Sequence, residues 1–202
     1  MGLADLTVQV IVFRVFALMI LVGIHGGIIA WTAVRLGDPG PRYDGRLTVV
    51  PTSHLDLLGA VCLILFGLGW SRPVAVDAQK LRFGRAGVGL IILMGALSLL
   101  TTAAILGALI QPAITSLSLT SGLATAAFLR AASDLAIAFA LLSLLPIPPL
   151  AGGLLLDAFG VRLTSSVQLI LTAALVVVIA MGTTIRIIDP VAAVLAPIIL
   201  GT

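Results

Sequence analysis

The sequence contains no glutamate, one cysteine and two histidines, so it is poor in the side chains that most catalytic sites use. The single cysteine, Cys62, cannot form a disulfide bond within the chain, and the lack of glutamate excludes any mechanism that needs a glutamate base. Only 9% of the 202 residues are charged, whereas soluble domains carry about 25%. This composition excludes a soluble globular domain and also a disordered chain, which would need low hydrophobicity.

What the chain has in abundance is apolar sequence, since 60% of its residues are hydrophobic. A membrane-spanning helix needs about 20 apolar residues, because the hydrocarbon core is about 30 Å thick and each residue rises about 1.5 Å. The sequence therefore predicts an all-α polytopic membrane protein that forms one domain over residues 1–202. About five spans are expected, with an error of one, at 15–34, 55–70, 86–110, 119–145 and 166–185, followed by an apolar tail at 189–200.

The segments between these spans are expected to be loops. Residues 46–50 are β-prone and predict a short interfacial strand or hairpin arm, residues 111–120 predict an uncharged loop, and residues 146–153 predict an extended or broken segment. The basic residues lie mostly at the edges of apolar runs, which is typical of membrane orientation and headgroup contact rather than of nucleic-acid binding. If all five spans cross, this bias places the N-terminus inside. The membrane is expected to be a prokaryotic-type inner membrane.

Three stretches then resemble one protein family in their residues, order and spacing. The first stretch holds the loop motif residues Gly37, Asp38, Arg46, Pro51, His54 and Asp56. The second is Gly69-Trp70-Ser71-Arg72-Pro73-Val74. The third runs from Leu144 through the three prolines at 146, 148 and 149 to Gly153. Together they resemble the site-2 protease family of intramembrane zinc metalloproteases, in its compact form without a PDZ domain. The resemblance covers about residues 15–160 and leaves the helix at about 166–185 and the apolar tail as additions.

The resemblance implies a metal site at positions that this chain fills with other residues. In the family, two histidines at i and i+4 of a helix hold zinc, and the glutamate after the first one acts as the base. Those three positions here are His25, Gly26 and Ile29. The family's third ligand, an aspartate in a Leu-Asp-Gly motif, is Ala151, and an asparagine usual shortly before Leu-Leu-Pro is Ser143.

These losses predict a pseudoenzyme with no catalytic residues, no cofactor and no bound metal. We expect a scaffold or accessory subunit that contacts the lipid bilayer and packs against other membrane proteins. One alternative is an active zinc metalloprotease, or one completed by a partner's ligands. A second alternative is a small transporter or channel that uses His25, Arg130 and Asp134 inside the membrane.

The remaining candidate residues each have a structural and a functional interpretation. We favour a neutral, hydrogen-bonded His25 over a ligand to a partner's cofactor. Arg130 and Asp134, four residues apart, can pair on one helix face, and we favour a self-neutralised pair inside the bundle over a proton path or a polar contact with another subunit. Gly23 and Gly27 predict either close packing of a second helix or ordinary tolerance of glycine in a membrane helix. Ala132, Ala136 and Ala140 form a second stripe of small residues, which we expect to face the bundle interior rather than a partner helix.

Overall fold

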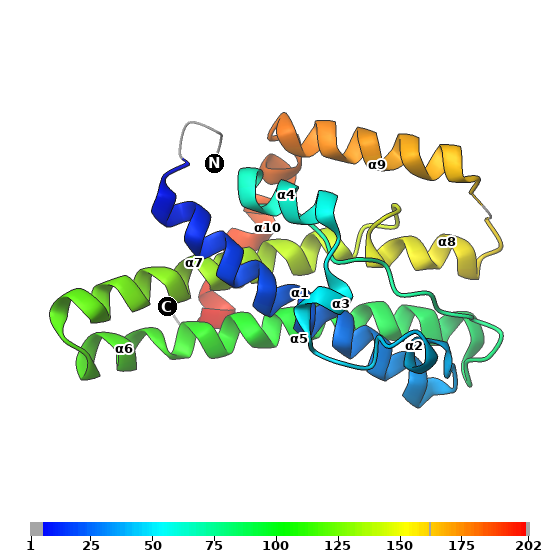
Figure 1. The fold of residues 1–202 in the computed structure, drawn as a ribbon, viewed down its shortest axis with the longest axis horizontal. Coiled ribbons are helices and arrows are strands. Elements are labelled where there is room, and N and C mark those ends of the chain that lie inside the picture. The colour runs from blue at the N-terminus through cyan, green and yellow to red at the C-terminus, as the bar shows by residue number, and fades with distance from the viewer. Residues whose placement is uncertain (1–5, 162, 201–202) are drawn as a thin grey trace.

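The structure is a computed structural model that describes residues 6–161 and 163–200. These residues are mainly helical, as predicted, and Figure 1 shows long helices packed side by side with shorter ones against them. The helices are α1 (Val8–Leu36), α2 (Gly40–Tyr43), α3 (Pro51–His54), α4 (Leu57–Phe66), α5 (Gly84–Ala108), α6 (Ile110–Ser116), α7 (Leu119–Ser143), the 3-10 turn η2 (Ala151–Gly153), α8 (Leu154–Ala158), α9 (Ser165–Ala180) and α10 (Thr183–Leu200).

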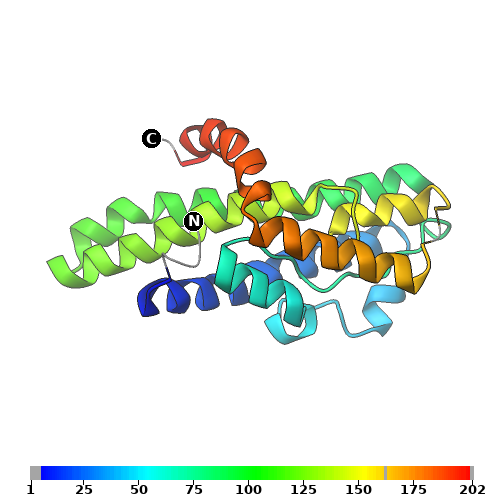
Figure 2. The same ribbon diagram turned by 90° about the horizontal axis from the view of Figure 1, so that it is seen from above.

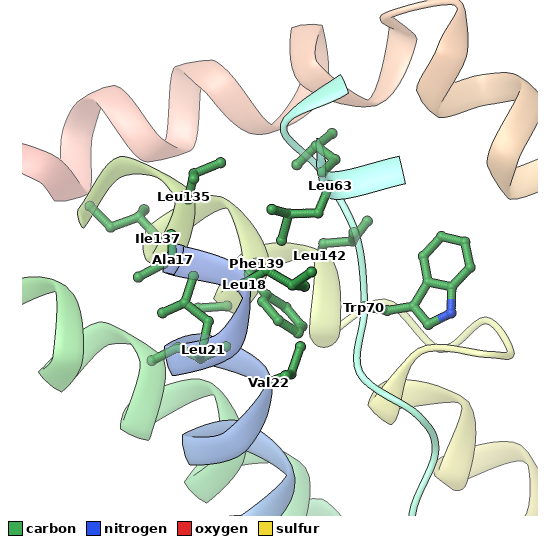
Figure 3. Close-up of a cluster of buried hydrophobic side chains, with 14 of the residues drawn as sticks. Ala17, Leu18, Leu21, Val22, Leu63, Trp70, Leu135, Ile137, Phe139 and Leu142 are labelled. Atoms are coloured by element: carbon green, nitrogen blue, oxygen red, sulfur yellow. The ribbon is translucent and has the colours of Figure 1, made fainter. Parts of the chain in front are cut away.

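Helices α1, α5 and α7 form the centre of the fold. Phe13 meets Phe128 edge-on with ring centroids 5.5 Å apart, and His25 lies 5.0 Å from Phe139, so α1 and α7 run in the same direction. Helix α5, which lies between α1 and α7 in the sequence, runs antiparallel to both of them. Large buried side chains from α1 and α7 meet where these helices cross (Figure 3), among them Leu18, Leu21, Phe139 and Leu142.

The alanine stripe of α7 lies in this core, as predicted. Ala132, Ala136 and Ala140 are each exposed by 1% or less. Beside them, Ser133 donates a hydrogen bond of 3.1 Å to the carbonyl oxygen of Ala103 on α5. Small side chains let two helix backbones approach closely, which accounts for the extensive α5–α7 contact.

Fewer helices are long enough to cross a membrane than the sequence predicts. In the described part of the chain, α1, the continuous α5–α6 stretch and α7 are long and apolar enough for a span. The predicted span at 55–70 is the ten-residue α4, about 15 Å long, which ends at the left-handed Gly67. The predicted span at 166–185 is divided at the left-handed Gly182 into α9 and α10.

Two predictions for the segments between the spans are also wrong. No strand forms at 46–50, and β-pairing in residues 6–161 and 163–200 is limited to an isolated bridge between Leu55 and Ser71. The predicted loop at 111–120 is largely the helix α6, whose end lies at the far left of Figure 1. Segment 146–153 is irregular before η2, as expected.

The short α4 brings two loops to one end of the molecule. The amide of Arg82 donates to the carbonyl of Leu36 at 2.8 Å, and the amide of Asp77 donates to the carboxylate of Asp38 at 2.8 Å. The loops after α1 and before α5 are therefore neighbours, whereas five crossing spans would have placed them on opposite sides. They lie at the end of the fold opposite to α6 (Figure 1).

Candidate functional site

The positions that correspond to the family's metal ligands do meet in the structure. The segment 71–74 passes beside the middle of α1, and the hydroxyl of Ser71 lies 2.9 Å from Nδ1 of His25. A cavity of about 10 Å³ beside it is lined by Ile29 from α1 and Ala151 from η2. The motif spacing therefore located residues from distant segments that lie around one point.

The side chains at this point do not fit a zinc ion. Ile29 and Ala151 offer only hydrocarbon, and a catalytic zinc needs about three protein ligands. Among the described residues, no three His, Cys, Asp or Glu side chains are grouped so that they could hold a metal ion. The cavity is close to the smallest volume that holds one water molecule, so the site is filled by the protein itself.

His54 packs directly against Gly26, the position of the family's glutamate. A Cβ atom built on Gly26 would overlap the imidazole ring of His54, which is fully buried. Because a carbonyl oxygen only accepts, Nε2 of His54 donates its hydrogen bond of 2.8 Å to Thr48. Burial lowers the pKa of His54. The space that a base at position 26 would need is taken by this ring.

The glycines of α1 accommodate a loop rather than another helix, contrary to the prediction of close helix packing. A Cβ atom on Gly27 would come within 2.8 Å of the carbonyl oxygen of Thr48, and one on Gly23 would overlap the carbonyl oxygen of Val49. The irregular backbone at 48–49 therefore lies directly on the α1 helix. This face of α1 is covered from within the chain.

His25 is buried, as expected for a residue in the middle of α1. Its Nδ1 is bonded to Ser71, its ring is tilted against Phe139, and its Nε2 has no hydrogen-bond partner among the described residues. Gly95 on α5 closes that side, since a Cβ there would lie 3.1 Å from Nε2. The surroundings of His25 are those of a packed core histidine.

The family loop residues fasten this region together. Arg46 is 7% exposed and donates from one nitrogen to the carbonyl oxygens of Arg72 at 2.8 Å and Pro73 at 2.7 Å. Asp38 is 2% exposed and accepts from Gly40 at 3.0 Å and from Asp77. These contacts hold the two loops against each other.

Other motif positions end or begin local elements. Gly37 terminates α1 with a φ of 116°, which a glycine adopts without strain. Asp56 caps α4 by accepting from the amide of Gly59 at 2.8 Å, and Pro51 begins α3. The hydroxyl of Ser143 donates within its own helix to Ala140 at 2.8 Å. None of these contacts involves the cavity beside Ile29.

Arg130 and Asp134 pair as predicted, but not inside the bundle. Nε of Arg130 lies 3.4 Å from Oδ2 of Asp134, and the two side chains are 52% and 45% exposed. They line a groove of about 470 Å³ together with Arg14 and Asp189. The four-residue spacing predicted the pair, whereas nothing in the sequence indicated that Arg14 and Asp189 would lie beside it.

Comparison with known proteins gives one partial similarity. A stretch of 86 residues is 30% identical to a protein of Bacillus subtilis (strain 168) named Putative zinc metalloprotease YwhC. The match covers 43% of this chain and 39% of that protein. No family model matches the chain, and no solved structure matches it. The similarity supports a protease-like relationship over part of an all-α membrane protein.

Proposed function

We propose that this chain is a non-catalytic, site-2-protease-like membrane protein that acts as an accessory subunit of a larger membrane complex. The observation that carries the proposal is the filled space around Gly26, Ile29 and Ala151. A ring, a branched alkyl group and a methyl group stand where a base and two ligands would be needed. Binding without cleavage is the function that such a scaffold retains.

The metal content of the purified protein tests the non-catalytic part. We expect less than about 0.1 zinc per chain after purification without chelators and dialysis against micromolar zinc, because two of the three ligands are missing. A His25→Ala variant, purified alongside, is expected to give the same value. Stoichiometric zinc that disappears in His25→Ala would overturn the proposal and favour a metalloprotease.

The mass of the complex released from native membranes tests the accessory part. A tagged chain, expressed at its native level and extracted in mild detergent, is expected to elute with a companion membrane protein at a fixed ratio. Elution as a lone monomer under conditions that preserve other complexes would overturn this part. A zinc-loaded complex would instead favour the partner-completed protease.

The transporter alternative receives less support from the placement of its three residues. His25 faces Ser71 and Phe139, whereas Arg130 and Asp134 line the groove with Arg14, and His25 does not line that groove. An ion flux in liposomes that is lost in Asp134→Asn would restore this alternative.

The position of the loops also leads us to propose an orientation. Six of the eleven basic residues lie in the segments after α1 and before α5 or at the adjoining helix ends, and the positive-inside rule favours that end in the cytoplasm and the N-terminus outside. The six residues are Arg35, Arg42, Arg46, Lys80, Arg82 and Arg85. The expected inside N-terminus depended on a crossing at 55–70, where the structure has only the short α4.

Single cysteines test this orientation in a Cys62→Ala background. An impermeant maleimide added to intact cells is expected to label Ser116→Cys, on the exposed end of α6, and to leave Gln79→Cys unlabelled until the cells are lysed. The opposite pattern would support an inside N-terminus.

A further inference from the structure

The groove beside Arg130 lies between three helices that are far apart in the sequence. Its walls come from the first turns of α1 and from the middle of α7 and of α10, and Gly67 and Leu68, directly after α4, close one side. In Figure 2, α1 and α10 lie on either side of α7. The lining is mostly apolar, with contributions from Phe13, Leu135 and Ile188.

Charge of both signs is concentrated in this otherwise apolar groove. Arg14 is buried and donates to the carbonyl oxygens of Ile64 at 2.8 Å and Leu65 at 2.9 Å, so it fixes the end of α4. Arg130 and Asp134 are joined loosely at 3.4 Å and stay about half exposed. Asp189 on α10 is exposed and makes no ion pair within the described residues.

The length of the apolar stretch of α1 indicates the level of the groove within a membrane. Arg14 and Arg35 bracket an apolar stretch, 15–34, that rises about 30 Å, which equals the hydrocarbon thickness. Because Arg14 and Arg130 line the same groove, the pair on α7 lies level with Arg14, where the apolar stretch of α1 begins. If that stretch spans the membrane, this is the level at which lipid headgroups meet the first carbons of their acyl chains.

The size of the groove is that of a small-molecule site. Its volume of about 470 Å³ falls within the range of about 300–1,000 Å³ that is usual for such sites. Its lining joins an apolar wall to charges of both signs, which matches a zwitterionic amphiphile that carries an acyl chain beside a phosphate and an ammonium group.

We propose that this groove binds phosphatidylethanolamine. The phosphate lies against the guanidinium of Arg130, the primary ammonium donates to the carboxylates of Asp134 and Asp189, and an acyl chain follows the apolar wall that contains Ile188. Each charge of the headgroup then lies beside a side chain of opposite charge. The loose Arg130–Asp134 pair is stabilised by the additional charge-assisted hydrogen bonds that the headgroup makes. The proposal is independent of whether the chain is an accessory subunit.

Lipid retention by the full chain tests the proposal. The purified protein is exchanged into micelles with equal amounts of phosphatidylethanolamine, phosphatidylcholine and phosphatidylglycerol, and the retained lipids are counted by native mass spectrometry. We expect about one phosphatidylethanolamine per chain, at least tenfold over phosphatidylcholine, which lacks an N–H donor, and over phosphatidylglycerol, which lacks the ammonium.

Substitutions then assign the contacts. Asp134→Asn and Arg130→Gln are each expected to reduce retained phosphatidylethanolamine at least fivefold, while the double variant Asp77→Asn with Lys80→Gln, an exposed pair in the loop before α5, retains the wild-type amount. Circular dichroism and the elution volume verify that each variant is folded. Equal retention of all three lipids, preference for phosphatidylglycerol, retention unaffected by Asp134→Asn, or displacement of the lipid by a co-purifying membrane protein would each overturn the proposal.

Discussion

The middle of α1 and the groove beside Arg130 place polar groups in a membrane protein in opposite ways. Around α1, His25 and His54 are almost completely buried, and each has a hydrogen bond to another part of the chain. In the groove, Arg130 and Asp134 stay about half exposed. The first region is closed by its own side chains, whereas the second still presents charge to a ligand. Burial and partners, rather than the residue types, distinguish a structural centre from a binding site.

The largest effect is expected where the closed centre has no spare room. Gly26→Glu would force a carboxylate into the ring of His54, and the overlap together with a buried unpaired charge should lower the free energy of unfolding by about 4 kcal/mol or more. A reversible denaturant titration in mixed micelles measures this. Gly89→Ala is the control, because a Cβ on Gly89 meets nothing within 4 Å.

The smaller substitution Gly26→Ala separates overlap from charge. It should cost about 1–3 kcal/mol in the wild-type background and clearly less in His54→Ala, where the ring is absent. An equal cost in both backgrounds would show that His54 does not occupy this space.

The next effect concerns the fastening of the loops. Arg46→Leu removes two hydrogen bonds from a charged donor to Arg72 and Pro73, and should lower the free energy of unfolding by about 2–3 kcal/mol. Arg42→Leu, at an exposed arginine of the neighbouring helix α2, is the control and should change the free energy of unfolding by less than about 0.5 kcal/mol. Similar losses for the two variants would contradict the role assigned to Arg46.

An intermediate effect is expected at the buried histidine. Ser71→Ala leaves Nδ1 of His25 without a partner and should cost about 1–2 kcal/mol, measured in the same titration. In a His25→Leu background the serine substitution should cost less, because no imidazole remains unsatisfied. Additive costs would mean that the Ser71–His25 contact contributes nothing.

The smallest stability effect is expected in the groove. Asp134→Ala and the double variant Arg130→Leu with Asp134→Ala should differ by less than about 0.5 kcal/mol, because a half-exposed ion pair contributes little. The interior pair expected from the sequence would make the single variant clearly less stable than the double one. A difference above about 2 kcal/mol, measured without added lipid, would therefore indicate a buried pair.

The sequence predicted the helices that depend on local pattern and missed the contacts that depend on the fold. The uncharged run at 86–110 became α5, and alanines at four-residue steps became the buried face of α7, because both signals are periodic along one helix. The run at 55–70 is equally apolar, yet the left-handed Gly67 ends α4 after ten residues.

The candidate site shows the same division. Motif spacing indicated which positions would meet, and Ile29 and Ala151 do line one cavity. The packing of His54 on Gly26 could not be predicted, because it depends on the path of the loop at 48–54 across α1. The exposure of Arg130 likewise depends on where α10 ends up, which no local pattern encodes.

The packing of His54 against Gly26 also bears on how such a chain can evolve. A carboxylate at position 26 first requires the loop to withdraw, and larger polar side chains in place of Ile29 or Ala151 enter a cavity of only about 10 Å³. Each single step lowers stability before any metal can compensate. The closed centre therefore makes every single step toward a metal site destabilising, and a metal site would need several substitutions together.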